Sequence, residues 1–206
     1  MKHCHCQCRN PQNGLKMCYH PKLLEMLRYI STLFKKHDIP FWLDKGTLLG
    51  AARDNKMIPW DNDIDIGVWL SDYKRILDLA PIALEEEGYS LEPSISGTPT
   101  QINLRYSPVC IWTMCIDGWQ IEGDEAVIPQ YPRYRCPKEY VQNLDKIIFE
   151  GVEYPCPQHP EICLTNFYRE NWKVPQVLSL CKGIVNYFRT SNKDVVEEMK
   201  KWGYYD

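Results

Sequence analysis

The stretch that decides the fold runs from Phe41 to Trp69 and reads FWLDKGTLLGAARDNKMIPWDNDIDIGVW. It carries aspartates at alternate positions, Asp61, Asp63 and Asp65, just before an apolar run. Residues two apart on a strand point to the same side. A strand starting at Asp63 therefore puts the carboxylates on one face and the intervening isoleucines in the core. Because carboxylates this close repel each other, we expect a divalent cation with hard oxygen ligands, Mg²⁺, Mn²⁺ or Ca²⁺.

A glycine turn lies upstream of the aspartates. Gly46-Thr47 opens a short helical segment that extends to position 55. Helix N-termini and glycine turns present unpaired backbone N–H groups, which makes this segment a natural phosphate cradle. Arg53 is a candidate for a bidentate phosphate contact, and Lys45 is a further candidate for phosphate binding.

The whole chain has the composition of an ordinary globular protein. It has 206 residues, of which 44% are hydrophobic and 25% charged, and a net charge of −3. This charge gives no reason to expect nucleic-acid binding. We expect a tail at 1–20, one domain at 21–206, and no transmembrane segment, because no apolar run has the necessary length.

Ten cysteines are many for this length. The tail holds Cys4, Cys6 and Cys8, followed by Cys18, and the others are Cys110, Cys115, Cys136, Cys156, Cys163 and Cys181. Disulfides in a secreted or Golgi-lumen domain and a structural zinc site both fit this usage. The spacing is not a repeated C-x-x-C pair, and the two interpretations stay open.

Periodicity predicts a mixed set of elements. Helices are expected at 22–37, 73–87, 160–171 and 193–202, with Ser71 as N-cap of the second, Pro81 kinking or splitting it and Gly88 closing it. Strands are expected at 41–44, from position 63, and at 89–92, 102–106 and 111–116, with a hairpin at 147–154. This order indicates an α+β or α/β fold, a mixed β-sheet flanked by helices. In such a sheet, Asp117 can lie on a strand beside Asp63 and Asp65.

The segment 123–146 is rich in Pro, Tyr and Arg and has no clear period. A long irregular segment in a compact domain is often a functional loop, and its arginines are suited to an anionic substrate. A solvated surface loop is the alternative interpretation.

Two readings of the acidic motif can be compared. A calcium-binding EF-hand loop requires Gly and Glu where this chain has Ile66 and Asp72, so that reading fails. Metal-dependent phosphoryl transfer fits better, because carboxylates on adjacent strands can bridge paired cations. Asp117 is then a candidate for the second metal position or for the proton of the acceptor hydroxyl, and Asp61 is a further candidate ligand.

The motifs resemble those of the LicD and fukutin family, within the polymerase-β-like nucleotidyltransferase superfamily. The segments WLDKGTLLGAAR and IPWDNDIDIG are similar to the family's signature, and residues 115–119 are similar to its hydrophobic-Asp-hydrophobic-Trp element. The likeness extends over roughly 22–175. The chain departs from the pattern at Asn62, and at Lys45, where a tyrosine is common.

This resemblance implies transfer of a phospho-alcohol, phosphocholine or ribitol or glycerol phosphate, from a CDP-activated donor to a glycan hydroxyl. It also implies Mg²⁺ or Mn²⁺ held by Asp63 and Asp65, with Asp117 as third carboxylate, and a glycan or glycoprotein acceptor in the Golgi lumen. A cytoplasmic location is the alternative.

Other functions stay open at this stage. One is nucleotidyl transfer that releases pyrophosphate. A second is a metal-dependent glycosyltransferase, which the Gly-Thr turn disfavours. A third is a catalytically silent binding or scaffold member of a glycosylation complex.

Overall fold

The computed structural model describes residues 20–58, 61–94, 99–106 and 113–174. Its helices are α1 (His20–Lys36), α2 (Lys45–Asp54), the 3₁₀ turn η2 (Leu70–Asp72), α3 (Tyr73–Leu77), α4 (Ala80–Glu87), α5 (Lys138–Gln142) and α6 (Pro160–Tyr168). The strands are β1 (Phe41–Leu43), β2 (Asp63–Trp69), β3 (Ser90–Pro93), β4 (Gln101–Arg105), β5 (Thr113–Glu122), β6 (Glu125–Val127), β7 (Arg135–Pro137), β8 (Asp145–Phe149) and β9 (Val152–Cys156).

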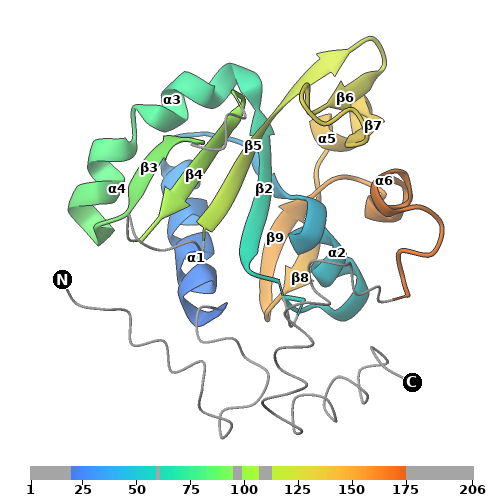
Figure 1. Ribbon diagram of the computed structural model, residues 1–206, viewed down its shortest axis with the longest axis horizontal. Coiled ribbons are helices and arrows are strands. Elements are labelled where there is room, and N and C mark those ends of the chain that lie inside the picture. Colours follow the sequence, from blue (N-terminus) through green and yellow to red (C-terminus); the bar gives the residue numbers. More distant parts are fainter. Residues whose placement is uncertain (1–19, 59–60, 95–98, 107–112, 175–206) are drawn as a thin grey trace, which may run out of the picture.

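The predicted mixed sheet flanked by helices is confirmed. The main sheet has seven strands in the order β1-β2-β5-β4-β3, with β6 paired to β5 and β7 to β6. Strands β2 and β5 are parallel, and the other pairs of this sheet are antiparallel. Figure 1 shows α1 crossing behind the sheet, and α2 and α6 near the separate hairpin β8–β9. The parallel pair β2–β5 lies in the middle of the strand order and carries the acidic residues.

The core forms because the apolar positions of α1 and of the sheet meet. Buried residues recur along α1 at helical spacing and include Leu23, Leu27, Ile30 and Phe34. On β2 the isoleucines that alternate with the aspartates, Ile64 and Ile66, are fully buried, as the alternation predicts. Gly67 allows the buried Trp42 indole to pack directly on this strand, because a Cβ there would lie 2.3 Å from the indole Nε1.

Helix α2 begins at a buried N-cap. The Asp44 side chain accepts a hydrogen bond from the Lys45 N–H at 2.8 Å, and Trp119 Nε1 on β5 donates to Asp44 Oδ2 at 2.8 Å. The helix ends at Asn55, which has left-handed backbone angles. Since Trp119 lies on β5, this cap fixes the start of α2 against the sheet.

The structure confirms some of the predicted elements and corrects others. Pro81 falls in the first turn of α4, so the 73–87 helix is split as predicted, and Gly88 closes it. Ser71 is not an N-cap, because it lies inside η2 and Asp72 precedes α3. The segment 123–146 is not an irregular loop throughout, since it contains β6, β7 and α5.

Two predictions concern residues that the structure does not describe. The helix predicted at 193–202 and nearly all of the 1–20 tail lie outside the described residues, although His20 already belongs to α1. None of the helices in the described part of the chain has the length and apolar character needed to cross a bilayer.

Candidate functional site

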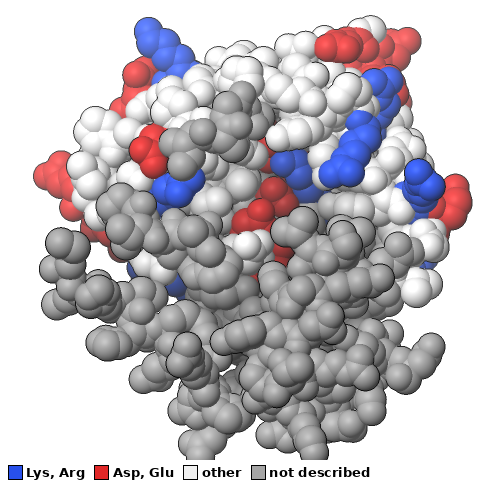
Figure 2. Space-filling view, in the orientation of Figure 1, with Lys and Arg blue, Asp and Glu red and all other residues white. Residues whose placement is uncertain are grey.

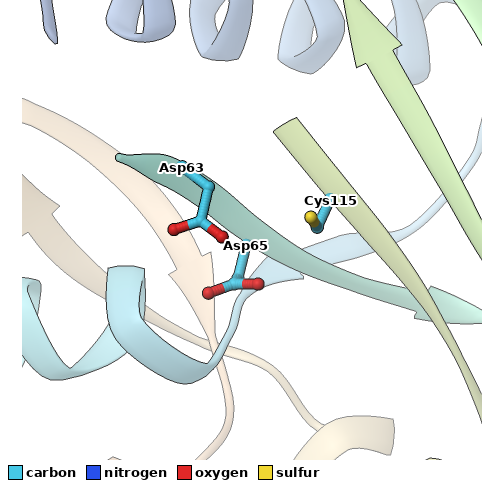
Figure 3. A group of neighbouring side chains, drawn as sticks. All are labelled: Asp63, Asp65 and Cys115. Carbon is cyan, nitrogen blue, oxygen red and sulfur yellow. The ribbon is translucent and has the colours of Figure 1, made fainter. Parts of the chain in front are cut away.

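The predicted acidic face is formed by the start of β2. Asp63 and Asp65 project to the same side of the strand (Figure 3), and Asp65 is only 8% exposed. Asp61 precedes the strand, and its backbone carbonyl lies 2.8 Å from His20 Nε2 at the beginning of α1. Figure 2 shows acidic atoms beside basic ones near the middle of the face in view.

Strand β5 adds a cysteine and an aspartate to this face. The parallel register pairs Asp65 with Cys115 and Gly67 with Asp117. The Cys115 Sγ and carboxylate oxygens of Asp63 and Asp65 all lie within 4.8 Å of one another. Sequence analysis missed Cys115, although its position two residues before Asp117 puts both side chains on one side of the strand.

The start of α2 closes the site from the other side. Gly46 N–H donates to Asp65 Oδ2 at 3.3 Å, and the Asp65 N–H donates to Thr47 Oγ1 at 2.8 Å. A Cβ on Gly46 would lie 2.8 Å from Asp61 Oδ2. Glycine therefore lets the helix start approach the aspartates, and the predicted phosphate-binding pair Gly46-Thr47 lies directly beside Asp65.

Lys45 occupies the centre of the acidic face. Its Nζ lies 3.5 Å from Asp65 Oδ1 and contacts Asp117 Oδ2. Asp117 is fully buried, and its Oδ1 accepts a hydrogen bond from Gln101 Nε2 at 3.1 Å. The structure thus brings the third predicted carboxylate to the site, but with both of its oxygens engaged by the chain.

Arg53 lies in the last turn of α2, at the other end of the helix from Gly46, and its Nε lies 2.8 Å from Asp54 Oδ2. Its phosphate contact stays a prediction.

The arginines predicted to meet an anionic substrate have partners within the chain. Arg133 Nη2 donates to Tyr134 Oη at 2.6 Å, and Arg135 Nη1 donates to Glu125 Oε2 at 3.0 Å. The rings of Tyr131 and Tyr134 lie 5.7 Å and 5.4 Å from Lys45 Nζ. This segment thus brings two tyrosines to Lys45, and the Arg133 Cζ lies 4.6 Å from the centroid of the Tyr134 ring.

Burial and mutual repulsion raise the pKa of the site's carboxyls. Burial, together with the neighbouring Asp61, raises the pKa of Asp63 to about 8. Burial raises the pKa of Asp61 to about 6, despite a hydrogen bond between the Asp61 and Asp63 side chains. Burial also raises the pKa of Asp65 well above its ordinary value, with Lys45 opposing the shift. The cluster is thus costly to ionise without a cation, and its carboxylate oxygens suit Mg²⁺ or Mn²⁺.

In the part of the chain that the structure describes, the other cysteines form no comparable group. Cys115, Cys136, Cys156 and Cys163 are buried and free of disulfides. Among the described residues, the one group that could hold a metal is Asp63, Asp65 and Cys115. The remaining cysteines, on which a structural zinc site or disulfide would also depend, lie outside the described residues.

The fold belongs to the nucleotidyltransferase class. The solution structure of the antibiotic-resistance factor ANT(2'')-Ia matches with a TM-score of 0.50 and 12% identity, covering 88% of this chain and 90% of that one. At this identity the likeness concerns the fold alone. The class agrees with a sheet that carries paired aspartates beside a helix start.

The chain belongs to the LicD/FKTN/FKRP family. The model of that family's nucleotidyltransferase domain matches residues 38–159, which include every predicted site residue. Human ribitol-5-phosphate transferase FKTN is 39% identical over 158 residues, which cover 73% of this chain and 33% of that protein. Human ribitol 5-phosphate transferase FKRP is 34% identical over 151 residues, covering 66% and 29%. The chain thus matches about a third of the length of these relatives.

Proposed function

We propose that this protein is a metal-dependent phosphotransferase that moves a phospho-alcohol from a CDP-activated donor to a glycan hydroxyl. The observation that carries the proposal is the cluster of Asp61, Asp63 and Asp65 directly against the Gly46-Thr47 helix start. Carboxylates and a helix N-terminus are the two features needed to hold a diphosphate with its cation. The relatives, named ribitol phosphate transferases, supply the class of transferred group.

The residues fit a divalent ion. Asp63 and Asp65, with Asp61 beside them, offer hard oxygen ligands, and their raised pKa values mean that a bound cation would relieve unfavourable repulsion. Mg²⁺ or Mn²⁺ would supply charge neutralisation for the donor's diphosphate and for the leaving phosphate. Cys115 adds a softer atom at the edge of this group.

The reaction proposed here breaks one phosphoanhydride bond. The acceptor hydroxyl oxygen attacks the donor phosphorus that carries the alcohol, a new P–O bond forms, and CMP leaves with the bridging oxygen. The proton of the hydroxyl passes to a base in the site or to water. Gly46 and Thr47 orient phosphate oxygens at the start of α2, while Asp117 holds Lys45 in position. Arg53, in the last turn of the same helix, is a further residue proposed to bind phosphate.

The setting follows from the relatives. We expect a glycan or glycoprotein acceptor and a location in the lumen of the secretory pathway. Because the chain matches about a third of each relative, acceptor specificity is a property to be measured on this chain itself.

The test is product analysis. The purified chain is incubated with an oligosaccharide acceptor and either CDP-ribitol, CDP-choline or CTP, with Mn²⁺ or with chelator. Release of CMP and a phosphodiester-modified acceptor from one CDP-alcohol, only with Mn²⁺, is expected. Release of pyrophosphate from CTP would instead establish nucleotidyl transfer. Inactivity with all donors, together with unchanged donor binding in Asp63→Asn, would refute the enzyme assignment in favour of a scaffold role.

A further inference from the structure

Lys45 occupies the place between the two strands where a second cation would bind. Its Nζ contacts Asp117 Oδ2 on β5 and lies 3.5 Å from Asp65 Oδ1 on β2. These carboxylates lie on neighbouring strands two residues apart in register, because Asp65 pairs with Cys115 and Gly67 with Asp117. A divalent ion bridging them needs the same oxygens that the ammonium already contacts.

The chain holds the ammonium in this position from several sides. Lys45 follows the buried N-cap Asp44, and its backbone has a φ of 41°, a left-handed conformation that is unfavourable for a residue with a side chain. The rings of Tyr131 and Tyr134 lie on the other side of the ammonium, and the residue is 8% exposed. An exposed lysine would be free to leave; this one is enclosed by α2, by both strands and by the tyrosines.

The charge of this lysine is maintained by its surroundings. A lysine ammonium is positively charged at neutral pH, and the carboxylates of Asp65 and Asp117 lie against this one. A permanent positive charge beside Asp65 and Asp117 repels a divalent ion at the same oxygens. The opposite end of the cluster, Asp61 and Asp63, is the part of the site that still gains from a divalent cation.

We propose that Lys45 is a built-in cation that takes the second metal position, so that this chain binds one divalent ion, at Asp61, Asp63 and the Oδ2 atom of Asp65, since Oδ1 is the Asp65 oxygen that lies 3.5 Å from the ammonium. The inference rests on the metal site of the proposed function. It differs from the ordinary expectation for paired carboxylates on adjacent strands, which is two ions. Asp117 then forms an ion pair with Lys45 instead of binding a metal ion. Lys45 acts through this pair and through Asp65, by fixing how much positive charge the site already holds.

The experiment counts metal ions without turnover. Mn²⁺ is titrated into the full chain, with no donor or acceptor, and binding is followed by calorimetry and by the electron paramagnetic resonance signal of free Mn²⁺. We expect one ion per wild-type chain and two ions per chain of Lys45→Met, which removes the charge but keeps a long side chain. Lys45→Arg keeps the charge and should bind one ion.

Two further variants separate charge from misfolding. Adding Asp117→Asn to Lys45→Met should return the count to one, because the second position loses a carboxylate. If circular dichroism shows that Lys45→Met is unfolded, Lys45→Gln takes its place with the same expected count. Two ions or none on the wild type, or a single ion on the folded uncharged variant, would overturn the inference. Two ions on the wild type would leave the proposed phosphotransfer intact, whereas no bound ion would count against its metal dependence as well.

Discussion

The two halves of the acidic site balance their charge in different ways. At the start of β2, the Asp61 and Asp63 side chains share a hydrogen bond with each other, and the pKa of each is raised. One step further along the parallel pair, Asp65 and Asp117 both contact the Lys45 ammonium. The first half therefore needs a proton or a bound cation to balance its negative charge. In the second half, the Lys45 ammonium already balances it.

This difference shows that the carboxylates of one acidic cluster can differ in how much they gain from a bound cation. Carboxylates that already have a buried cationic partner gain little from a metal ion, because binding would have to displace or face that partner. Carboxylates that have only each other gain most. Substitutions in the two halves should therefore have different effects on activity, on stability and on metal binding.

The largest effect is expected from Asp63→Asn, which breaks the half without a lysine. Transfer activity should fall by about 10²–10³-fold or more, the size associated with removing one preorganised electrostatic group. Product formation at saturating Mn²⁺ measures this. Unfolding in chelator is the control, and the variant should be no less stable than wild type, because a repelling carboxylate has been removed. Full activity in the variant would contradict the assignment of Asp63.

The half that contains Lys45 is tested through Gln101→Leu. Asp117 Oδ1 loses the hydrogen bond from Gln101, and a buried polar group left unsatisfied costs about 1–3 kcal/mol. Urea unfolding should show a loss of this size. Gln120→Leu on β5 is the matched control, because the Gln120 side chain bonds only the exposed Glu122 in the described structure. Its effect should stay within about 0.5 kcal/mol. Equal losses in both variants would argue against a special role of the Asp117 hydrogen bond.

The pH dependence of stability sharpens the comparison further. The pKa values of about 8 for Asp63 and about 6 for Asp61 lie above the ordinary value of 3.8, so the folded state holds more protons than the unfolded state between these limits. Stability in chelator is therefore greatest at low pH and falls as pH rises from about 4 to about 8. Thermal unfolding across this range measures the slope, and Asp63→Asn should flatten it. A wild-type stability that rises with pH would show that the cluster is ionised at little cost.

The smallest effect is expected from Cys115→Ala. Its sulfur lies within 4.8 Å of carboxylate oxygens of Asp63 and Asp65, but Mn²⁺ and Mg²⁺ prefer oxygen, so Mn²⁺ affinity should change little. Cd²⁺, a thiophilic ion, should give ultraviolet thiolate-to-metal absorption in the wild type that decreases in the variant, since the chain has nine other cysteines. Cys156→Ala, a buried cysteine on β9, is the control and should keep the absorption. Undiminished absorption in Cys115→Ala would locate the thiolate elsewhere.

The local parts of the site could be predicted from sequence. Asp63, Asp65 and the Gly46-Thr47 turn are each defined by spacing within one element, where strand alternation and helix-start chemistry apply directly. The contact between Lys45 and Asp117 joins residues 72 positions apart and depends on the register of β2 and β5, which periodicity does not give. The place of Cys115 in the site could not be predicted, because Cys115 lies in an apolar run and such a run predicts only burial in the core.

The segment after β5 shows the same limit. Strands β6 and β7 have three residues each, too few for an alternation to be visible, and the segment between them contains Pro129 and Pro132, which are typical of loops. They become strands because β6 pairs with the end of β5 and β7 pairs with β6. That pairing also explains how Tyr131 and Tyr134, which lie between β6 and β7, come to rest over Lys45.

The parallel pairing of β2 with β5 has a consequence for how the site comes into being. Asp65 and its register partner Cys115 are separated by 115 − 65 = 50 positions, with η2, two helices and two strands between them. Contacts at such sequence separation close late in folding, since chain entropy is lost before the contacts are gained. A peptide containing only the aspartate motif would therefore have the ligands but not their geometry. Metal binding should appear only with the last cooperative step of folding.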